Sequence, residues 1–166
     1  RLIIGGSTTG IADLNDVKSA CAPPLFKTMM NNHRIPEKVD LTPDKQTRKR
    51  MTSDEEDANQ HVTSFLIMLD SMQTTALPHL AGYITAPEVK ACYTLQTFQE
   101  QVHTQAYQYG LQTFYNFTER ERIYNLWREN QLLLDRNQFI ADNYQAFIDS
   151  ATVDNFKTML FSDYVM

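Results

Sequence analysis

The sequence has few cysteines, and they are not arranged in the patterns through which cysteines usually act. Cys21 and Cys92 are the only two among 166 residues. Their spacing is not that of a zinc site, and they do not make the disulfide framework on which small secreted domains depend. Two free thiols are typical of a reducing compartment, so we expect the protein to be cytoplasmic.

Long apolar runs and an excess of basic residues are also missing. No run approaches the roughly 18 apolar residues that span a bilayer, and the N-terminus lacks the pattern of a signal peptide. Lys and Arg total 15 against 20 for Asp and Glu, which gives a net charge of −5. Because phosphate binding needs a basic surface, we expect neither a nucleic acid nor a membrane as a partner.

Strand-like alternation is absent too, and most of the 5 glycines and 6 prolines lie in the first half of the chain. We divide the sequence into a leader, residues 1–52, with one short helical piece at 25–31, and a helical region, residues 53–166. The length suits one domain with a core. The expected class is all-α, a bundle of long antiparallel helices.

Helix-start signals place the long helices. Ser53 with Glu56, and Thr118 with Glu121, have the spacing of capping boxes. Pro87 suits the first turn of another helix. The predicted helices cover about 53–82, 86–114, 118–148 and 152–166.

Three polar side chains share one stripe of the second predicted helix. Glu100, His103 and Tyr107 are spaced i, i+3 and i+7, so they lie on the same side. Glu-x-x-His is how a helix bundle presents a carboxylate and an imidazole to one metal ion. The spacing alone is a weak signal, since the pair recurs by chance on surface helices and Tyr107 alone is explained as a core tyrosine.

Asp70 adds a third candidate ligand. It follows the most apolar run of the chain, residues 65–69, where a lone carboxylate is costly unless it is paired or bound to a metal. Taken alone, Asp70 is also explained by rotation toward solvent or by capping of a neighbour. With Glu100 and His103 on an antiparallel helix, it completes the three donors of a half-site.

The stretch MLDSMQTTALPHLAGYITAPEVKACYTLQTFQEQVHTQAYQY, residues 68–109, resembles the radical-generating small (beta) subunit of class I ribonucleotide reductase. In that family an Asp-Ser pair is followed, after a Pro-Glu helix start, by Glu-x-x-His and then by a Tyr four residues past the His. Asp70, Glu100, His103 and Tyr107 fall on this pattern. The resemblance runs in order over nearly the whole chain.

The resemblance implies a ferritin-like bundle and an oxidoreductase function. Asp70, Glu100 and His103 would bind one ion of a dinuclear iron or manganese centre. Tyr107 would be oxidised to a stable radical. A large subunit would use that radical to reduce ribonucleotides to deoxyribonucleotides for DNA replication.

A stable radical needs a dry pocket and a path for the electron. Phe98, Leu95 and the apolar run 65–69 are candidates to shield Tyr107. For the path, the family usually has Trp immediately before x-Pro-Glu in the leader, where this sequence has Arg34. A guanidinium is not reversibly oxidised, which puts transfer along the usual path in doubt.

The chain carries about half of the family's metal site. The remaining ligands, a Glu and a second Glu-x-x-His, come from later helices, and this sequence has one Glu-x-x-His. We therefore expect a complementary chain or segment with those ligands, besides the large subunit, and a dimer. Because the sequence begins at Arg1 without an initiator Met, we also expect processing or a longer parent protein.

One alternative stays open. Two copies of the Asp70, Glu100 and His103 half-site would meet across a dimer and form a ferritin-like di-metal oxidase, which has no need of a relay at Arg34.

Overall fold

The structure is a computed structural model that describes residues 2–165, apart from the side chains of Asp163 and Val165. Within that range helices make up the regular structure, and the only pairing of extended segments is one antiparallel bridge between Ile4 and Ile84. No helix of the described range is long and apolar enough to cross a membrane. The predicted all-α class is confirmed. In chain order the elements are α1 (Ala22–Asn31), η1 (Pro36–Lys38), α2 (Thr42–Arg48), α3 (Ser53–Tyr83), α4 (Pro87–Phe114), α5 (Phe117–Ile123), η2 (Leu126–Arg128), α6 (Gln131–Asp149) and α7 (Val153–Val165).

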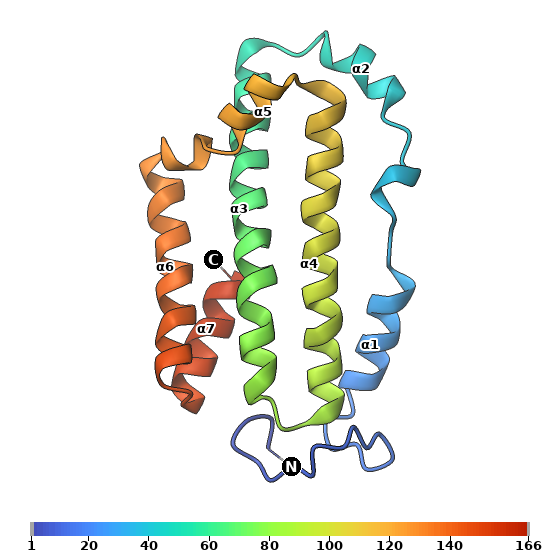
Figure 1. Cartoon of the computed structure of the whole chain (residues 1–166), viewed down its shortest axis with the longest axis vertical. Helices are drawn as coiled ribbons and strands as arrows, with labels where there is room; N and C mark the ends of the chain where they lie inside the picture. The colour runs from blue at the N-terminus through green and yellow to red at the C-terminus, as the bar shows by residue number, and fades with distance from the viewer. Residues whose placement is uncertain (1, 166) are drawn as a thin grey trace.

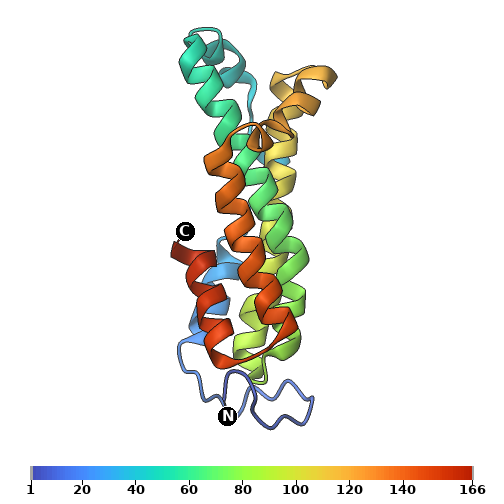
Figure 2. The same cartoon turned by 90° about the vertical axis from the view of Figure 1, so that its left-hand side faces the viewer.

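The two longest helices, α3 and α4, lie side by side and antiparallel at the centre of the molecule (Figure 1). A short turn at 84–86 joins them. On the side of α3 away from α4, α6 packs against α3 and α7 packs against α6, while α1 lies along α4 (Figures 1 and 2). Residues in the middle of α3 therefore face residues in the middle of α4.

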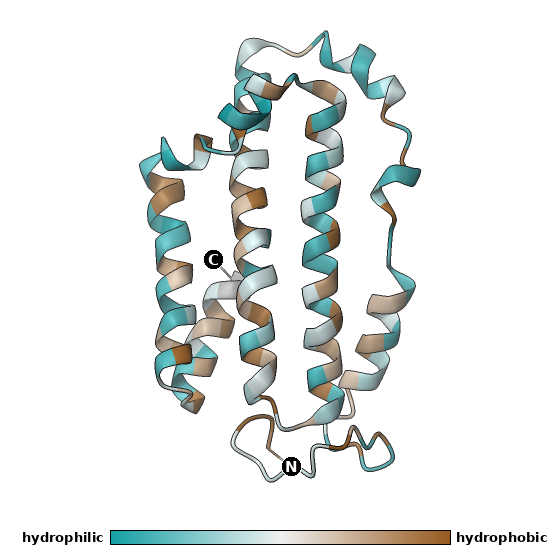
Figure 3. Cartoon of the chain, in the orientation of Figure 1, coloured by the Kyte–Doolittle hydropathy of each residue, from teal (hydrophilic) through white to brown (hydrophobic). Residues whose placement is uncertain are grey.

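The apolar core is divided into two clusters along α3 and α4. In the larger one, Leu77 and Leu80 of α3 pack with Phe147 of α6 and Met159 of α7, and each of these side chains is at most 1% exposed. Full burial of such a side chain stabilises the fold by about 1.5–3 kcal/mol. The smaller cluster consists of Ile67, Leu111, Ile123 and Leu126. Polar residues interrupt both helices between the two clusters, and both ribbons alternate in hydropathy along their length (Figure 3).

The start of α3 is a capping box, one residue earlier than predicted. The Thr52 hydroxyl, not that of Ser53, accepts a hydrogen bond from the Glu55 amide at 3.3 Å, and the Glu55 carboxylate accepts one from the Thr52 amide at 2.8 Å. Both residue pairs have the S/T-x-x-E spacing, so the sequence pattern alone cannot choose between them.

The predicted helix over 118–148 is in fact two helices. Asn116 and Glu119, not the predicted Thr118 pair, form the capping box of α5. After the short η2 turn, Asn130 caps α6 by accepting hydrogen bonds from two amides of its first turn. Asn is among the strongest N-cap residues, and it starts a new helix where apolar spacing suggested a continuous one.

The leader has more helix than the predicted short piece at 25–31, because η1 and α2 follow α1. At the end of α2, an Arg48 Nη atom lies 2.6 Å from each carboxylate oxygen of Glu56. The Arg48 guanidinium also lies over the rings of Phe114 and Tyr115, 4.7 and 4.8 Å from their centroids. These contacts attach the leader to the ends of α3 and α4.

We expect Tyr115→Phe to weaken this attachment measurably. The Tyr115 hydroxyl donates a hydrogen bond to Glu56 Oε1 at 2.5 Å, and loss of a bond to a charged group costs about 1.5–3 kcal/mol. Tyr124→Phe is the matched control, since Tyr124 packs against the same smaller cluster and its hydroxyl bonds to no described residue. Urea unfolding should separate the two variants by at least about 1 kcal/mol. Equal unfolding free energies would show that the hydroxyl adds nothing.

Candidate metal centre

The structure brings together the three side chains that the sequence singles out as ligands. Asp70 lies midway along α3, and Glu100 and His103 lie one turn apart midway along α4. One potential ligand atom from each falls within 4.8 Å of the others. His103 Nδ1 is 3.1 Å from Glu100 Oε2 and 3.8 Å from Asp70 Oδ2. Their convergence is a property of the fold, whereas their role as ligands stays a prediction.

The two carboxylates are buried, while the imidazole is open on one side. The Asp70 and Glu100 side chains are 9% and 12% exposed, against 56% for His103. Asp70 Oδ2 is buried and has no hydrogen-bond partner in the structure. An unpartnered buried carboxylate oxygen is costly unless a cation or a proton neutralises it.

Burial, and to a smaller extent the neighbouring negative charge of Glu100, raise the pKa of Asp70 to about 6, although His103 acts in the opposite direction. A raised carboxyl pKa means that the folded chain holds this proton more tightly than the unfolded chain. The site therefore favours a positive partner for Asp70, either a proton or a metal ion. The donor set, two carboxylates and one imidazole, suits iron or manganese.

We expect Asp70→Asn to stabilise the metal-free protein at neutral pH. The folded pKa of Asp70, about 6, exceeds the ordinary value of 3.8, so its contribution to stability is present below pH 4 and is lost as the pH rises to 6. The shift corresponds to about 3 kcal/mol at most. Urea unfolding in the presence of a chelator should show wild type losing stability over pH 4–6 and Asp70→Asn losing less. Asp57→Asn, at an exposed position of the same helix, is the control, and a wild-type-like pH slope in Asp70→Asn would contradict the expectation.

Tyr107 lies one turn beyond His103 on α4 and is half-buried against the smaller apolar cluster. Burial, together with the negative charges of Asp70 and Glu100, raises the pKa of Tyr107 to about 12. The phenol is thus protonated at neutral pH. No described residue forms a hydrogen bond with its hydroxyl.

The side chains that cover Tyr107 are only in part those that the sequence predicted. Phe98 is 48% exposed, and its ring packs against His33 of the leader with centroids 5.1 Å apart, so its prediction as part of the shield was wrong. Ile67, from the predicted apolar run, does belong to the cluster that covers Tyr107. The other three members of the cluster come from the end of α4, from α5 and from η2. Sequence reasoning missed them because contacts between distant elements leave no local pattern.

Arg34 lies near the candidate ligands. It lines a pocket of about 230 Å³ between the leader and α4, and His103 lines the same pocket. No described residue accepts a hydrogen bond from His103 Nε2. The leader position at which the resemblance expects a tryptophan relay therefore lies beside the imidazole of the candidate site.

Comparison with known proteins adds an independent line of evidence. The family described as "Ribonucleotide reductase, small chain" matches residues 12–165. The chain belongs to this family. Family membership places the Asp70, Glu100 and His103 group in a small-chain fold, as the sequence resemblance predicted.

Individual small-chain relatives agree. The ribonucleoside-diphosphate reductase subunit beta of Treponema pallidum is 38% identical over the whole of this chain, and that of Aquifex aeolicus is 39% identical. The ribonucleotide reductase R2 subunit from Clostridium botulinum is 39% identical, with a TM-score of 0.91 over 99% of this chain. The ferritin-like helical fold is thereby confirmed.

The chain spans about half the length of most of these small chains. It covers 47% of the Treponema pallidum protein, 24% of the Aquifex aeolicus protein and 52% of the Clostridium botulinum chain.

Proposed function

We propose that this chain is the N-terminal half of a radical-generating ribonucleotide reductase small subunit, and that Asp70, Glu100 and His103 bind one ion of a dinuclear iron or manganese centre. The observation that carries the proposal is the convergence of these three donors from two helices, with a buried oxygen on Asp70 that makes no hydrogen bond. A bound cation would neutralise the two adjacent carboxylates.

Three protein donors are too few for two metal ions. Bundle di-metal sites take carboxylates and imidazoles from all four helices. We propose that a complementary chain or segment supplies a Glu and a second Glu-x-x-His and packs against α3 and α4. The His103 side chain is 56% exposed, so the half-site is accessible to such a segment on the side of the imidazole.

In this proposal the chain's own side chains would bind the metal ions and provide the oxidisable phenol, which is that of Tyr107. Two adjacent redox metals, when bound, activate oxygen and supply an oxidant strong enough for a phenol. Tyr107 would be the residue that gives an electron to this oxidant, and its hydroxyl proton would have to leave with the electron, because the pKa of about 12 keeps the phenol protonated beforehand. The cluster around Ile67 and Leu111 covers one side of the ring and restricts the access of water to it.

The partners follow from the names of the relatives, which are reductase beta subunits. We propose that the assembled protein is a dimer, works with a large subunit that reduces ribonucleotides, and needs neither nucleic acid nor a membrane. We place it in the cytoplasm, since both cysteines are free thiols. With Arg34 in place of the relay tryptophan, either another aromatic residue relays the electron that passes from the large subunit to the oxidised Tyr107, or the chain is not part of an active reductase. The di-metal oxidase alternative gains no support from these relatives.

The test is reconstitution. The full-length protein should take up two metal ions per chain, form a tyrosyl radical with ferrous iron or manganese and oxygen, and reduce ribonucleoside diphosphates once the large subunit is added. Residues 1–166 expressed alone should do none of these. A monomer of residues 1–166 with two irons and a stable radical would refute the split site, and a dimer with the same properties would favour the oxidase.

A further inference from the structure

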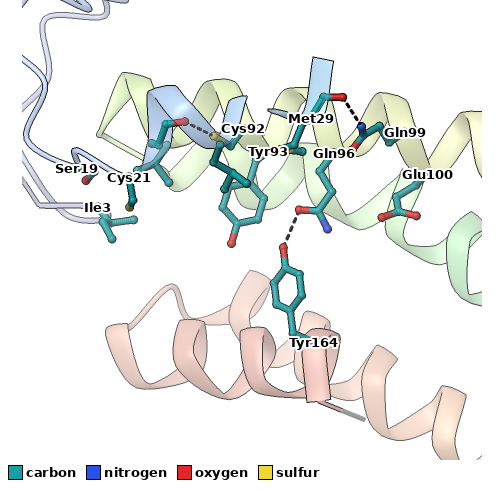
Figure 4. Close-up of a pocket in the computed structure, with 13 residues that line it drawn as sticks. Ile3, Ser19, Cys21, Met29, Cys92, Tyr93, Gln96, Gln99, Glu100 and Tyr164 are labelled. Carbon is teal, nitrogen blue, oxygen red and sulfur yellow. Dashed lines mark hydrogen bonds between the residues drawn. The ribbon is translucent and has the colours of Figure 1, made fainter. Parts of the chain in front are cut away.

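The fold places the only two cysteines at one end of a single pocket. Cys21 lies in the turn that precedes α1, and Cys92 lies in the second turn of α4. Both line the apolar pocket of about 530 Å³ between these helices. Figure 4 shows them toward one end of the pocket, with Ser19 nearby and Glu100 at the opposite end. Residues far apart in the sequence are thus neighbours in space.

The side chain of Cys92 contacts the backbone of the residue next to Cys21. The Cys92 thiol donates a hydrogen bond of 3.4 Å to the carbonyl oxygen of Ala22, the residue after Cys21 (Figure 4). Cys21 is the N-cap of α1, but its side chain makes no capping hydrogen bond, so rotation of this side chain breaks no helix contact. A disulfide needs Cα atoms within about 7 Å. The turn at Cys21 is the part that can adjust to meet that requirement, because Cys92 is held inside α4.

We propose that Cys21 and Cys92 are a dithiol modification site, which a low-molecular-weight disulfide converts reversibly into an intramolecular disulfide between α1 and α4. The two thiols have different parts in this reaction. Cys21 is exposed and meets the reagent first, whereas Cys92 is buried. Burial raises the pKa of the Cys92 thiol, and a nearby Cys21 thiolate raises it further, so Cys92 is the slower nucleophile until a partner sulfur is beside it.

With glutathione disulfide the reaction balances in two exchanges. The Cys21 thiolate attacks one sulfur of glutathione disulfide, forms a mixed disulfide and releases one glutathione. The Cys92 thiolate then attacks Cys21 Sγ, which breaks the mixed disulfide and releases the second glutathione. Two protein thiols lose two electrons, glutathione disulfide gains them, and the two thiol protons leave on the two glutathiones.

The product would attach the leader to the helix that carries Glu100 and His103. In the thiol form α1 is held to α4 by packing and by bonds such as that from Gln99 Nε2 to Met29 O, at 3.0 Å. A covalent bond across the long loop between the cysteines restricts the unfolded chain. The oxidised protein should therefore have a thermal midpoint roughly 5–15 °C above that of the reduced protein.

The experiment treats the full-length protein with glutathione disulfide and measures free thiols, intact mass and cross-linked peptides. We expect wild type to lose the thiols of Cys21 and Cys92 without keeping glutathione, to give a peptide pair joined through them, and to recover with dithiothreitol. Cys92→Ala should keep one glutathione on Cys21, and Cys21→Ser should leave the Cys92 thiol unmodified.

Three results would overturn the proposal. Wild type that keeps glutathione on Cys21 would show that Cys92 cannot reach it. An unreactive Cys21 would show that it is covered in the full-length protein. Disulfide-linked dimers through Cys21 would show an intermolecular reaction. Because the measurement reads thiols and not metal or radical, its outcome does not depend on the proposed metal centre.

Discussion

Tyr107→Phe should leave the metal content of the assembled protein unchanged and remove its radical. The substitution deletes one hydroxyl that bonds to no described residue, and it keeps the ring that packs against the smaller apolar cluster. Metal binding and folding should therefore survive. Since phenylalanine has no ionisable proton to lose with the electron, reductase turnover with the large subunit should fall by more than about a thousandfold. Electron paramagnetic resonance and metal analysis on the same sample measure both quantities.

Tyr109→Phe is the control for Tyr107→Phe. It lies two residues further along α4, and its hydroxyl donates to the leader carbonyl of Val39 at 3.1 Å. We expect the Tyr109 variant to keep both radical and turnover. If Tyr107→Phe keeps full activity while the radical signal persists, Tyr107 is a core residue and the oxidised group lies elsewhere.

His103→Ala should remove the metal. His103 is the one nitrogen donor of the half-site, and its Nδ1 faces both carboxylates. Even residues that only orient a ligand change metal affinity by about 10–100-fold, so loss of a ligand should lower it at least a hundredfold. Titration with ferrous iron or manganese and elemental analysis of the purified protein both report this change.

His79→Ala is the matched control, because His79 is an exposed histidine near the C-terminal end of α3 and lies outside the candidate site. Its metal content should equal that of wild type. Wild-type metal affinity in His103→Ala would contradict the assignment of His103 as a ligand. The imidazole would then be only a surface group beside Glu100.

Much of the fold follows from local sequence patterns. The apolar spacing of α3 and α4 and the Pro87 start predicted both helices to within a few residues. The break between α5 and α6 could not be predicted in the same way, because a continuous apolar pattern is compatible with one helix or two, and the Asn130 cap decides between them. In the leader, α1 was predicted in part as the helical piece at 25–31, whereas η1 and α2 were missed, because both are short and α2 is stabilised by contacts of Arg48 with Glu56 and Tyr115 outside the leader.

The residues of the candidate site could also be recognised from local features of the sequence. Glu100 and His103 are neighbours within one helix, and Asp70 stands out as a carboxylate after an apolar run, so local features single out all three as candidates, and the family resemblance assigns them the role of ligands. The shield of Tyr107 and the pairing of Cys21 with Cys92 are different. They arise where separate elements meet, and no spacing along the chain encodes them.

Anomalous X-ray diffraction from crystals of the full-length protein loaded with manganese or iron tests the central claim most directly. We expect an anomalous peak bound by Asp70, Glu100 and His103 at about 2.0–2.3 Å from their oxygen and nitrogen atoms. A second peak should lie close by, with ligands from a Glu and a Glu-x-x-His outside residues 1–166. Full metal occupancy at another place, with the Asp70 side chain in contact with no ion, would contradict the account.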